Sequence, residues 1–223
     1  MAKAHALKKN ITFPASAEPF FASKKHVVYS SAVGFILLAL SLVANFAANV
    51  FATNRMGNPV NDIILDNIPT YNVSALFFQG FGLFLVLAAV LLVIKPKRLP
   101  FALKSLAMFI LIRSSFIILT HMGPPANEMF FDPGTISKKL TAGADLFFSS
   151  HTGLPFLAAL LFWEHKTYRY LFLALSLIFG AAVLLGHLHY SIDVFSAFFI
   201  TYGIYHISRT FFKKDMKLFE KAR

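Results

Sequence analysis

Residues 73–94 read VSALFFQGFGLFLVLAAVLLVI, a stretch that carries no charged side chain. The hydrocarbon core of a bilayer is about 30 Å thick, and a helix needs about 20 predominantly apolar residues to cross it. This stretch has the required length, and Lys95, Lys97 and Arg98 follow it directly. It therefore predicts a membrane-spanning helix whose C-terminal end lies beside a cluster of positive charge.

Five further apolar runs give the rest of the chain the same character. They cover residues 27–52, 100–120, 144–163, 170–188 and 190–208. Of the 223 residues, 57% are hydrophobic and only 14% are charged, whereas about 25% of the residues in an ordinary soluble domain are charged. We therefore expect an all-α integral membrane bundle of six transmembrane helices in residues 27–208, flanked by basic tails in residues 1–26 and 209–223.

The distribution of charge predicts the orientation of this bundle and argues against nucleic acid as a partner. The net charge is +11, but the Lys and Arg residues lie at loop edges and form no basic stripe on a polar fold. With a cytoplasmic N-terminus, 17 of the 21 Lys and Arg residues fall inside, three fall outside and Arg113 lies within the membrane. Because cytoplasmic loops are enriched in positive residues, we expect both termini to be cytoplasmic. The chain has no Cys, which excludes disulfides and thiolate metal sites.

Several ionisable side chains fall within the predicted membrane region at one depth. Arg113 lies in the outer part of the third run, and His151 lies about two turns into the fourth. His187, His189 and Asp193 lie where the fifth run meets the sixth. Ionisable groups are costly inside a bilayer and usually mark function. We therefore expect a site toward the non-cytoplasmic face, whether that face is periplasmic or lumenal.

The residue types in this group suggest proton and phosphoryl transfer. His189 and Asp193 are four residues apart, so they would share one helical face. A carboxylate there accepts a hydrogen bond from the imidazole and raises the basicity of the other ring nitrogen. His151 supplies a second proton-transfer group, and Arg113 can hold negative charge. The same His/Asp pair also fits a proton-coupled transporter.

Residues 142–153 read AGADLFFSSHTG, and residues 187–194 read HLHYSIDV. These stretches resemble the third and fourth signatures of the sphingomyelin synthase family, approximately C-G-D-x-x-F-S-G-H-T and H-x-H-Y-T-I-D-V. Weaker matches to the first two signatures come in the right order: Pro59-Val60-Asn61-Asp62 with Asp66, and Arg113-Ser114 with Gly123-Pro124-Pro125. This family is a branch of the type 2 phosphatidic acid phosphatase superfamily.

The resemblance implies a six-helix enzyme that needs no metal and no other cofactor. His189 would be the nucleophile that forms a phosphohistidine, Asp193 would orient it, and His151 would protonate the leaving diacylglycerol oxygen. A phospholipid would be the donor, and ceramide, another lipid alcohol or water would be the acceptor. The residues expected to bind the substrate are Arg113, Asp145, Ser149 and Asp62.

The chain departs from related patterns at three positions. Ser150 replaces the family glycine before His151. Val183 stands where classical lipid phosphatases have an arginine six residues before the nucleophile, and Arg113 is followed by Ser114 in place of proline. The differences at Val183 and Ser114 favour the synthase branch over the classical phosphatases, whereas Ser150 departs from the synthase signature and crowds a backbone that approaches the phosphate. A lipid phosphate phosphatase and a proton-coupled transporter stay open as alternatives, as do the headgroup, the acceptor and the oligomeric state.

Other polar residues have structural interpretations of equal or greater weight. His187 fits either an interface or the site, and Asp62 fits either a cap or a substrate contact. Glu128 and Asp132 are interpreted as ordinary loop acids.

Overall fold

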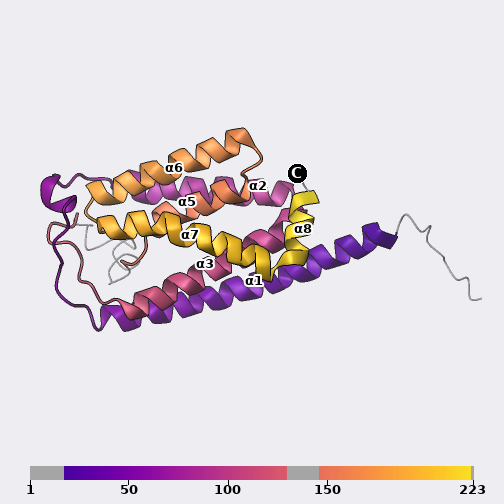
Figure 1. Cartoon of the computed structure of the whole chain (residues 1–223), viewed down its shortest axis with the longest axis horizontal. Coiled ribbons are helices and arrows are strands. Elements are labelled where there is room, and N and C mark those ends of the chain that lie inside the picture. Colours follow the sequence, from indigo (N-terminus) through magenta and orange to yellow (C-terminus); the bar gives the residue numbers. More distant parts are fainter. Residues whose placement is uncertain (1–17, 130–145, 222–223) are drawn as a thin grey trace, which may run out of the picture.

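The computed structural model describes residues 18–129 and 146–221, and every regular element in them is a helix (Figure 1). The elements are α1 (Glu18–Thr53), η1 (Leu65–Asn67), the π-helix η2 (Leu76–Gly80), α2 (Phe81–Ile94), η3 (Pro96–Arg98), α3 (Leu99–Leu119), α5 (Ser150–Leu161), α6 (Lys166–Leu185), α7 (Ser191–Phe211) and α8 (Lys213–Lys221). The prediction of an all-α chain is therefore confirmed for the described residues.

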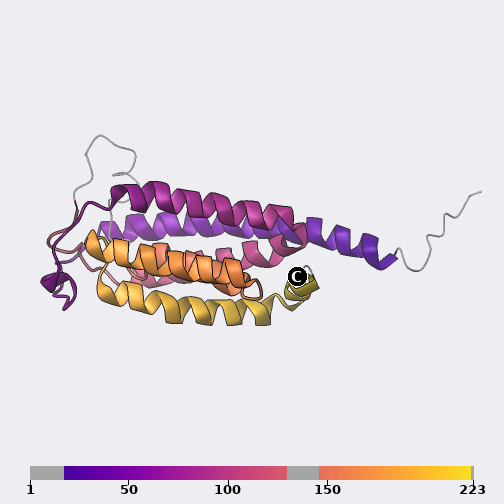
Figure 2. The ribbon, with the colours of Figure 1, turned by 90° about the horizontal axis from the view of Figure 1, so that it is seen from above.

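The long helices run side by side along one axis (Figures 1 and 2). α1 packs along α3, α5 packs against α6 and α7, and contacts between α3 and α7 join the two groups. The start of α1 and the end of α8 lie at one end of the bundle, which we call the terminal end (Figure 1). The opposite end, which we call the loop end, carries residues 54–75, residues 120–129 and the α6–α7 turn.

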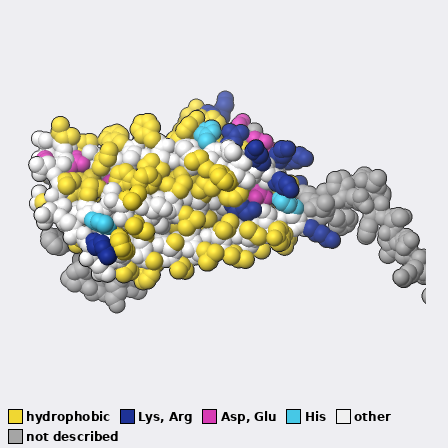
Figure 3. Space-filling model, turned by 60° about the horizontal axis from the view of Figure 1, so that its bottom comes forward, with side chains coloured by type: hydrophobic (Ala, Val, Ile, Leu, Met, Phe, Trp, Pro, Cys, Tyr) yellow, Lys and Arg dark blue, Asp and Glu magenta, His cyan; other side chains and the backbone are white. Residues whose placement is uncertain are grey.

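The surface of the bundle is typical of a protein embedded in a membrane. Four segments are long and apolar enough to cross a bilayer: Lys24–Thr53, Leu76–Ile94, Pro96–Leu119 and Lys166–Leu185. Figure 3 shows hydrophobic side chains across the middle of one face, with most of that face's Lys and Arg at the terminal end. Phe46 and Leu83 are each 71% exposed. Soluble proteins rarely expose apolar surface on this scale, so these features indicate a membrane protein.

The other two long helices of the bundle, α5 and α7, do not meet the length and apolarity required of a membrane-spanning helix. α5 has 12 residues, which gives a length of about 18 Å against a hydrocarbon core of about 30 Å. α7 has 21 residues but includes Asp193, Thr201, His206 and Arg209, and it is not among the four apolar spans. The expectation of six membrane-spanning helices is thus supported for four of them.

The fourth predicted helix begins later than its sequence suggests. The structure makes it helical only over Ser150–Leu161, and Ser149 before it has an extended backbone with φ −63° and ψ 119°. Leu146 and Phe148 are buried although they are not helical. Apolarity reflects their burial and cannot distinguish a buried extended segment from a helix. Consequently His151 is the second residue of α5, and the prediction that it lies two turns inside was wrong.

The predicted C-terminal tail forms a helix that packs across the terminal end. α8 buries Asp215, Met216 and Phe219, and the Phe219 ring lies 5.5 Å from the Phe101 ring of α3. Its lysines are all exposed: Lys213, Lys214, Lys217 and Lys221. At the other end of the chain, residues 18–26, expected as part of a tail, are the first turns of α1.

Asp215 also neutralises a lysine inside the bundle. Lys104 Nζ donates to Asp215 Oδ2 at 2.7 Å and to Ser30 Oγ at 2.6 Å. The Ser30 hydroxyl donates to Asp215 Oδ1 at 2.8 Å, and His26 Nε2 lies 2.9 Å from the same oxygen. Burial works against ionisation of Asp215, but its bonds to Lys104, Ser30 and His26 lower the pKa of this carboxyl. These contacts fasten α8 to α1 and α3.

Candidate active site

The α6–α7 turn is closed by backbone hydrogen bonds that fix where α7 begins. His187 has φ 51°, in the left-handed region that usually requires glycine. The His187 N–H donates to the Leu184 carbonyl at 2.9 Å, and the Leu188 N–H donates to the Val183 carbonyl at 2.8 Å. These two bonds form a Schellman motif, which satisfies the last carbonyls of α6 and reverses the chain. His189 therefore stands two residues before α7, next to its N-cap Tyr190, at the loop end.

His189 is held by two acceptors on the same ring nitrogen. Its Nδ1 lies 2.8 Å from the Leu146 carbonyl oxygen and 3.3 Å from Asp193 Oδ2. Both acceptors require a proton on Nδ1, which leaves the lone pair on Nε2. His189 is not helical, so it does not share a helical face with Asp193 as expected from their spacing. The contact arises instead because Asp193, in the first turn of α7, reaches back over the helix start.

Asp193 is fully buried and is stabilised by the start of α7. Its Oδ2 also accepts a hydrogen bond from the Tyr190 N–H at 3.0 Å, as in the carboxylate half of a capping box. The N-terminal end of a helix favours negative charge, so this position suits an ionised carboxylate. Its Oδ1 has no hydrogen-bond partner within the described residues. The carboxylate is thus placed to balance positive charge on His189.

The first turn of α5 lies beside this pair. The Ser149 N–H donates to the Asp193 carbonyl at 3.1 Å, which ties the start of α5 to the start of α7. Ser149 is completely buried, and its hydroxyl oxygen has no partner among the residues that the structure describes. A helix start presents N–H groups without intrahelical acceptors, and such groups bind phosphate. The start of α5 is therefore suited to an anion next to His189.

His151 lies in this first turn, and its ring packs against two aromatic rings. Its ring stacks on Phe77 of η2, with centroids 3.9 Å apart and planes at 21°. The Phe81 ring of α2 lies tilted against it, with centroids 4.0 Å apart and planes at 36°. His151 also lies within electrostatic range of both His189 and Arg113. The structure thus brings together His151, His189 and Arg113, as the sequence predicts. It adds the rings of Phe77 and Phe81, which no sequence motif relates to His151.

Arg113 approaches the same region from α3. Its side chain is buried, and Nε donates to the Phe148 carbonyl at 2.9 Å. Phe148 immediately precedes Ser149, so the guanidinium supports the segment that leads into α5. The cation is therefore placed beside the start of α5, where it can balance the negative charge of a bound anion.

Asp62 lies in the segment of residues 54–75 at the loop end and contacts the start of α7. Its Oδ2 accepts from the Ser191 N–H at 2.6 Å, and Oδ1 accepts from the N–H groups of Ile64 at 2.9 Å and Leu65 at 3.2 Å. Burial opposes ionisation, but the bonds from Ser191, Ile64 and Leu65 outweigh it and hold the pKa of this carboxyl below its usual value. Both oxygens are engaged in structure, which favours the capping interpretation of Asp62.

Two residues near the site were missed by sequence reasoning. Tyr190 is buried, and its hydroxyl donates to the Gly123 carbonyl at 2.8 Å and accepts from the Val60 N–H at 3.1 Å, so it joins the 54–75 and 120–129 segments to α7. Glu128, taken for an ordinary loop acid, lies within electrostatic range of His189. Burial raises the pKa of Glu128, and the charge of protonated His189 acts in the opposite direction. No sequence spacing relates Glu128 to His189, so only the fold could reveal this pair.

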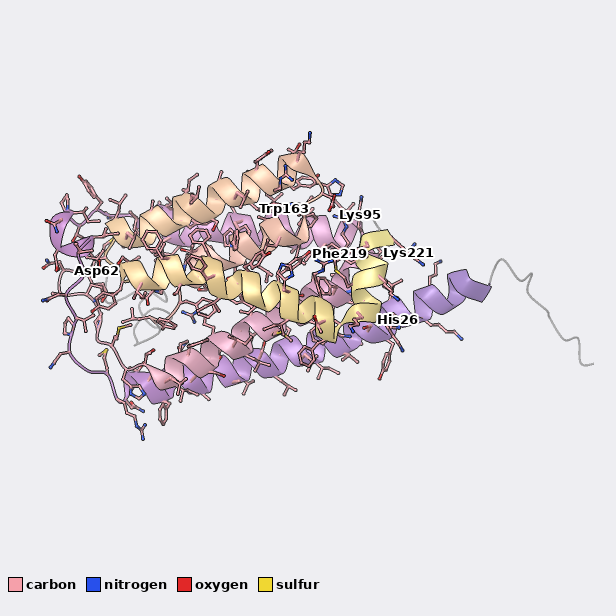
Figure 4. All side chains as sticks on the ribbon, in the orientation of Figure 1. His26, Asp62, Lys95, Trp163, Phe219 and Lys221 are labelled. Atoms are coloured by element: carbon pink, nitrogen blue, oxygen red, sulfur yellow. The ribbon has the colours of Figure 1, made fainter. Side chains whose placement is uncertain are left out.

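The outer edge of the site is hollowed at the loop end. A pocket of about 80 Å³ lies there between the 54–75 segment, the 120–129 segment and the α6–α7 turn, lined in part by Asp62, Asn127, His187 and Tyr190. His187 is 3% exposed, and its Nε2 has no hydrogen-bond partner in the described chain. Figure 4 shows Asp62 at this end, far from Trp163, Phe219 and Lys221. Asp145, expected to bind the substrate, and Asp132 lie outside the described residues.

Residues 143–210 match the family model described as PAP2 superfamily C-terminal. The match covers α5, α6 and almost all of α7, and so includes His151, His189 and Asp193. Arg113 and Asp62 precede it. No curated protein and no solved structure matches the chain. The match supports the PAP2 superfamily, which suggests phosphatase or phosphotransferase activity on lipid phosphates.

Proposed function

We propose that the chain is a membrane enzyme that moves or hydrolyses phospholipid headgroups through a phosphohistidine on His189. The observation that carries this proposal is the pair of acceptors on His189 Nδ1, the Leu146 carbonyl and the Asp193 carboxylate. They keep the lone pair on Nε2 and oppose the positive charge that the ring gains when Nε2 attacks phosphorus. The family match over the same residues supports this chemistry.

The first half-reaction transfers the phosphoryl-linked headgroup to the enzyme. Nε2 of His189 attacks the phosphorus, and the bond between phosphorus and the diacylglycerol oxygen breaks. His151 takes up a proton when the anionic phosphate binds beside it and gives that proton to the diacylglycerol oxygen, so diacylglycerol leaves as a neutral alcohol. The N–H groups at the start of α5, with Ser149, receive the phosphate oxygens, and Arg113 balances their charge from below.

The second half-reaction returns the enzyme to its starting state. His151, now neutral, takes the proton from the hydroxyl of the acceptor, whose oxygen attacks the phosphohistidine. The phosphorus–nitrogen bond breaks, and His189 regains its Nε2 lone pair. Ceramide, another lipid alcohol or water can each act as the acceptor in this scheme, so one site supports both transfer and hydrolysis.

Glu128 favours phosphodiester donors within this proposal. A phosphate monoester carries close to two negative charges at neutral pH, whereas a phosphodiester carries one. An ionised Glu128 within electrostatic range of His189 repels the monoester more strongly, while burial raises the pKa of Glu128 and thereby reduces this repulsion. This supports the sphingomyelin synthase-like version, in which a phospholipid with an intact headgroup is the donor. A lipid phosphate phosphatase is the second candidate, because the family match alone favours it equally.

Product analysis separates these two versions. The purified protein is incubated with labelled phosphatidylcholine, phosphatidylethanolamine or phosphatidic acid, each with and without ceramide, and the products are identified by mass spectrometry. We expect diacylglycerol from a phosphodiester donor and a headgroup-bearing sphingolipid when ceramide is present. Release of inorganic phosphate from phosphatidic acid alone would support the phosphatase. No turnover of any donor, with folded protein, would contradict both versions.

A further inference from the structure

A second pocket lies at the terminal end, away from the proposed catalytic residues. It has a volume of about 430 Å³ and is formed where the end of α5, the end of α7 and α8 meet. Figure 4 labels Trp163 in this region, together with Phe219 and Lys221, whereas Asp62 lies at the opposite end. The lining residues are Leu160, Leu161, Trp163, Glu164, Tyr202, Tyr205, His206, Arg209 and Glu220.

The pocket contains one cation and two carboxylates in a loose arrangement. Arg209 of α7 and Glu220 of α8 form an ion pair at 3.7 Å, and their side chains are 43% and 39% exposed. Glu164 contributes the second carboxylate. With His206 neutral, the formal charge of the lining is −1. A ligand that complements these charges carries a cationic group, which contacts the two carboxylates. It also carries no more than one negative charge, which contacts Arg209.

Aromatic rings provide the second feature of the pocket. Trp163 and Tyr202 are 45% and 53% exposed at its rim. The Tyr202 ring lies 4.3 Å from the His206 ring, and Arg209 lies over the Tyr205 ring at 5.8 Å. Aromatic faces attract ammonium groups, and Trp and Tyr gather where a membrane meets water. Leu160 and Leu161 add apolar surface beside these rings.

We propose that this pocket binds the headgroup of a phospholipid that carries an ammonium group, such as phosphatidylethanolamine or phosphatidylcholine. The phosphate lies against Arg209, and the ammonium lies between the two carboxylates and the aromatic rim. In this arrangement each charge of the zwitterionic headgroup faces a charge of opposite sign, the phosphate facing Arg209 and the ammonium facing Glu220. Leu160 and Leu161 lead the acyl chains toward the apolar flank of the bundle. The site is distinct from the proposed active site, and the inference does not depend on catalysis.

The only tryptophan of the chain, Trp163, reports on this pocket without any label. The protein is placed in phosphatidylglycerol nanodiscs with increasing fractions of lipid brominated near the carboxyl end of its acyl chains, since bromine quenches tryptophan fluorescence at short range. The brominated lipid has a phosphatidylethanolamine, phosphatidylcholine or phosphatidylglycerol headgroup. We expect the two ammonium lipids to reach half-maximal quenching at an about five- to tenfold lower mole fraction than phosphatidylglycerol, the effect of one charge-assisted interaction.

Variants test whether the charges of the pocket cause this preference. The double substitution Glu164→Gln and Glu220→Gln should remove most of it, while Lys214→Gln, an exposed residue of α8 outside the pocket, should leave it unchanged. Circular dichroism checks that each variant is folded. Equal quenching by all three headgroups would mean ordinary lipid contact and overturn the proposal. A preference for phosphatidylglycerol, or an unchanged preference in the folded double variant, would overturn it as well.

Discussion

His189 and Asp193 meet for a reason that their spacing suggests only indirectly. Two residues four apart touch on a helical face, but they also touch when the second caps the helix that the first precedes. The residue types and the spacing predicted the contact, and the Nδ1–Oδ2 distance of 3.3 Å confirms it. The sequence could not distinguish the two geometries, because the start of α7 depends on the Schellman turn at His187, a position where glycine is the usual signal.

Substitutions at the two histidines should separate nucleophile from acid. His189→Ala removes the atom that bonds to phosphorus, so transfer and hydrolysis should both be abolished. His151→Ala removes a proton donor worth about 10²–10⁴-fold in rate. A donor with a good leaving group, such as a p-nitrophenyl phosphate ester, needs no proton and should partly rescue His151→Ala. Steady-state rates with lipid and p-nitrophenyl donors measure both effects.

Trapping experiments supply the control for these roles. Wild-type enzyme quenched in alkaline detergent with labelled donor should contain a base-stable, acid-labile phosphoenzyme, and His189→Ala should contain none. If the better leaving group rescued His189→Ala while His151→Ala stayed inactive, the two roles would have to be exchanged.

Asp62 should stabilise the folded chain in a pH-dependent way. Its pKa is lower in the folded chain than its usual value of 3.8. The stabilisation is therefore present above pH 3.8 and is lost as the pH falls through the folded pKa. Asp62→Asn should lower the free energy of unfolding at pH 7 by about 1 kcal/mol, or the Tm by about 2–4 °C. Circular dichroism melts across this pH range should show the difference vanish in acid.

Asp66→Asn is the matched control for this prediction. Asp66 is exposed, and its carboxylate accepts one hydrogen bond, from the Asp62 N–H at 3.1 Å. Its substitution should change the Tm less at pH 7. A Tm difference for Asp62→Asn that persists unchanged into acid would show that the charge of Asp62 is not the cause.

At the scale of elements, the apolar runs predicted where helices occur better than where they begin. Residues 73–94 and 100–120 correspond to η2–α2 and α3, because both stretches are predominantly apolar over the length that a membrane-spanning helix needs. The fourth helix was predicted six residues too early, since Leu146 and Phe148 are buried without being helical. The π-helix that carries Phe77 left no sequence signal either, because glycine and aromatic residues occur equally in ordinary membrane helices.

α8 should depend on its buried ion pair. Asp215→Asn leaves the Lys104 ammonium inside the bundle without its counter-charge, and breaking a buried pair in this way costs about 3–5 kcal/mol. We expect a lower Tm and faster trypsin cleavage at the exposed lysines of α8, because the helix separates from α1 and α3. Thermal melts and timed proteolysis measure the two effects.

The double variant Lys104→Met with Asp215→Asn tests the cause. It removes both charges, so it should recover most of the stability lost in Asp215→Asn alone. If the two substitutions instead lowered the stability additively, the salt bridge would not be what holds α8.

The two ends of the molecule carry different kinds of side chain. The described Lys and Arg residues lie mostly at the terminal end, where both α1 and α8 have their outer ends, and the His/Asp site lies at the loop end (Figures 1 and 3). The sequence predicted this separation from charge and apolar runs alone. It could not predict that α5 is short or that α8 exists, because a short helix behind an extended apolar segment and an amphipathic helix of nine residues both lack a distinctive apolar run.

Orientation in the membrane follows from this charge asymmetry, and we predict that the terminal end faces the cytoplasm. The chain has no cysteine, so single substitutions can be labelled without altering the background. Ile63→Cys lies in the outer loop at a side chain that is 83% exposed and should react with a membrane-impermeant maleimide on intact cells or spheroplasts. Lys97→Cys, in η3 at the terminal end, should react only after the membrane is made permeable. Reaction of Lys97→Cys from outside would show that the orientation is the reverse of the predicted one, with the proposed phosphohistidine site on the cytoplasmic face.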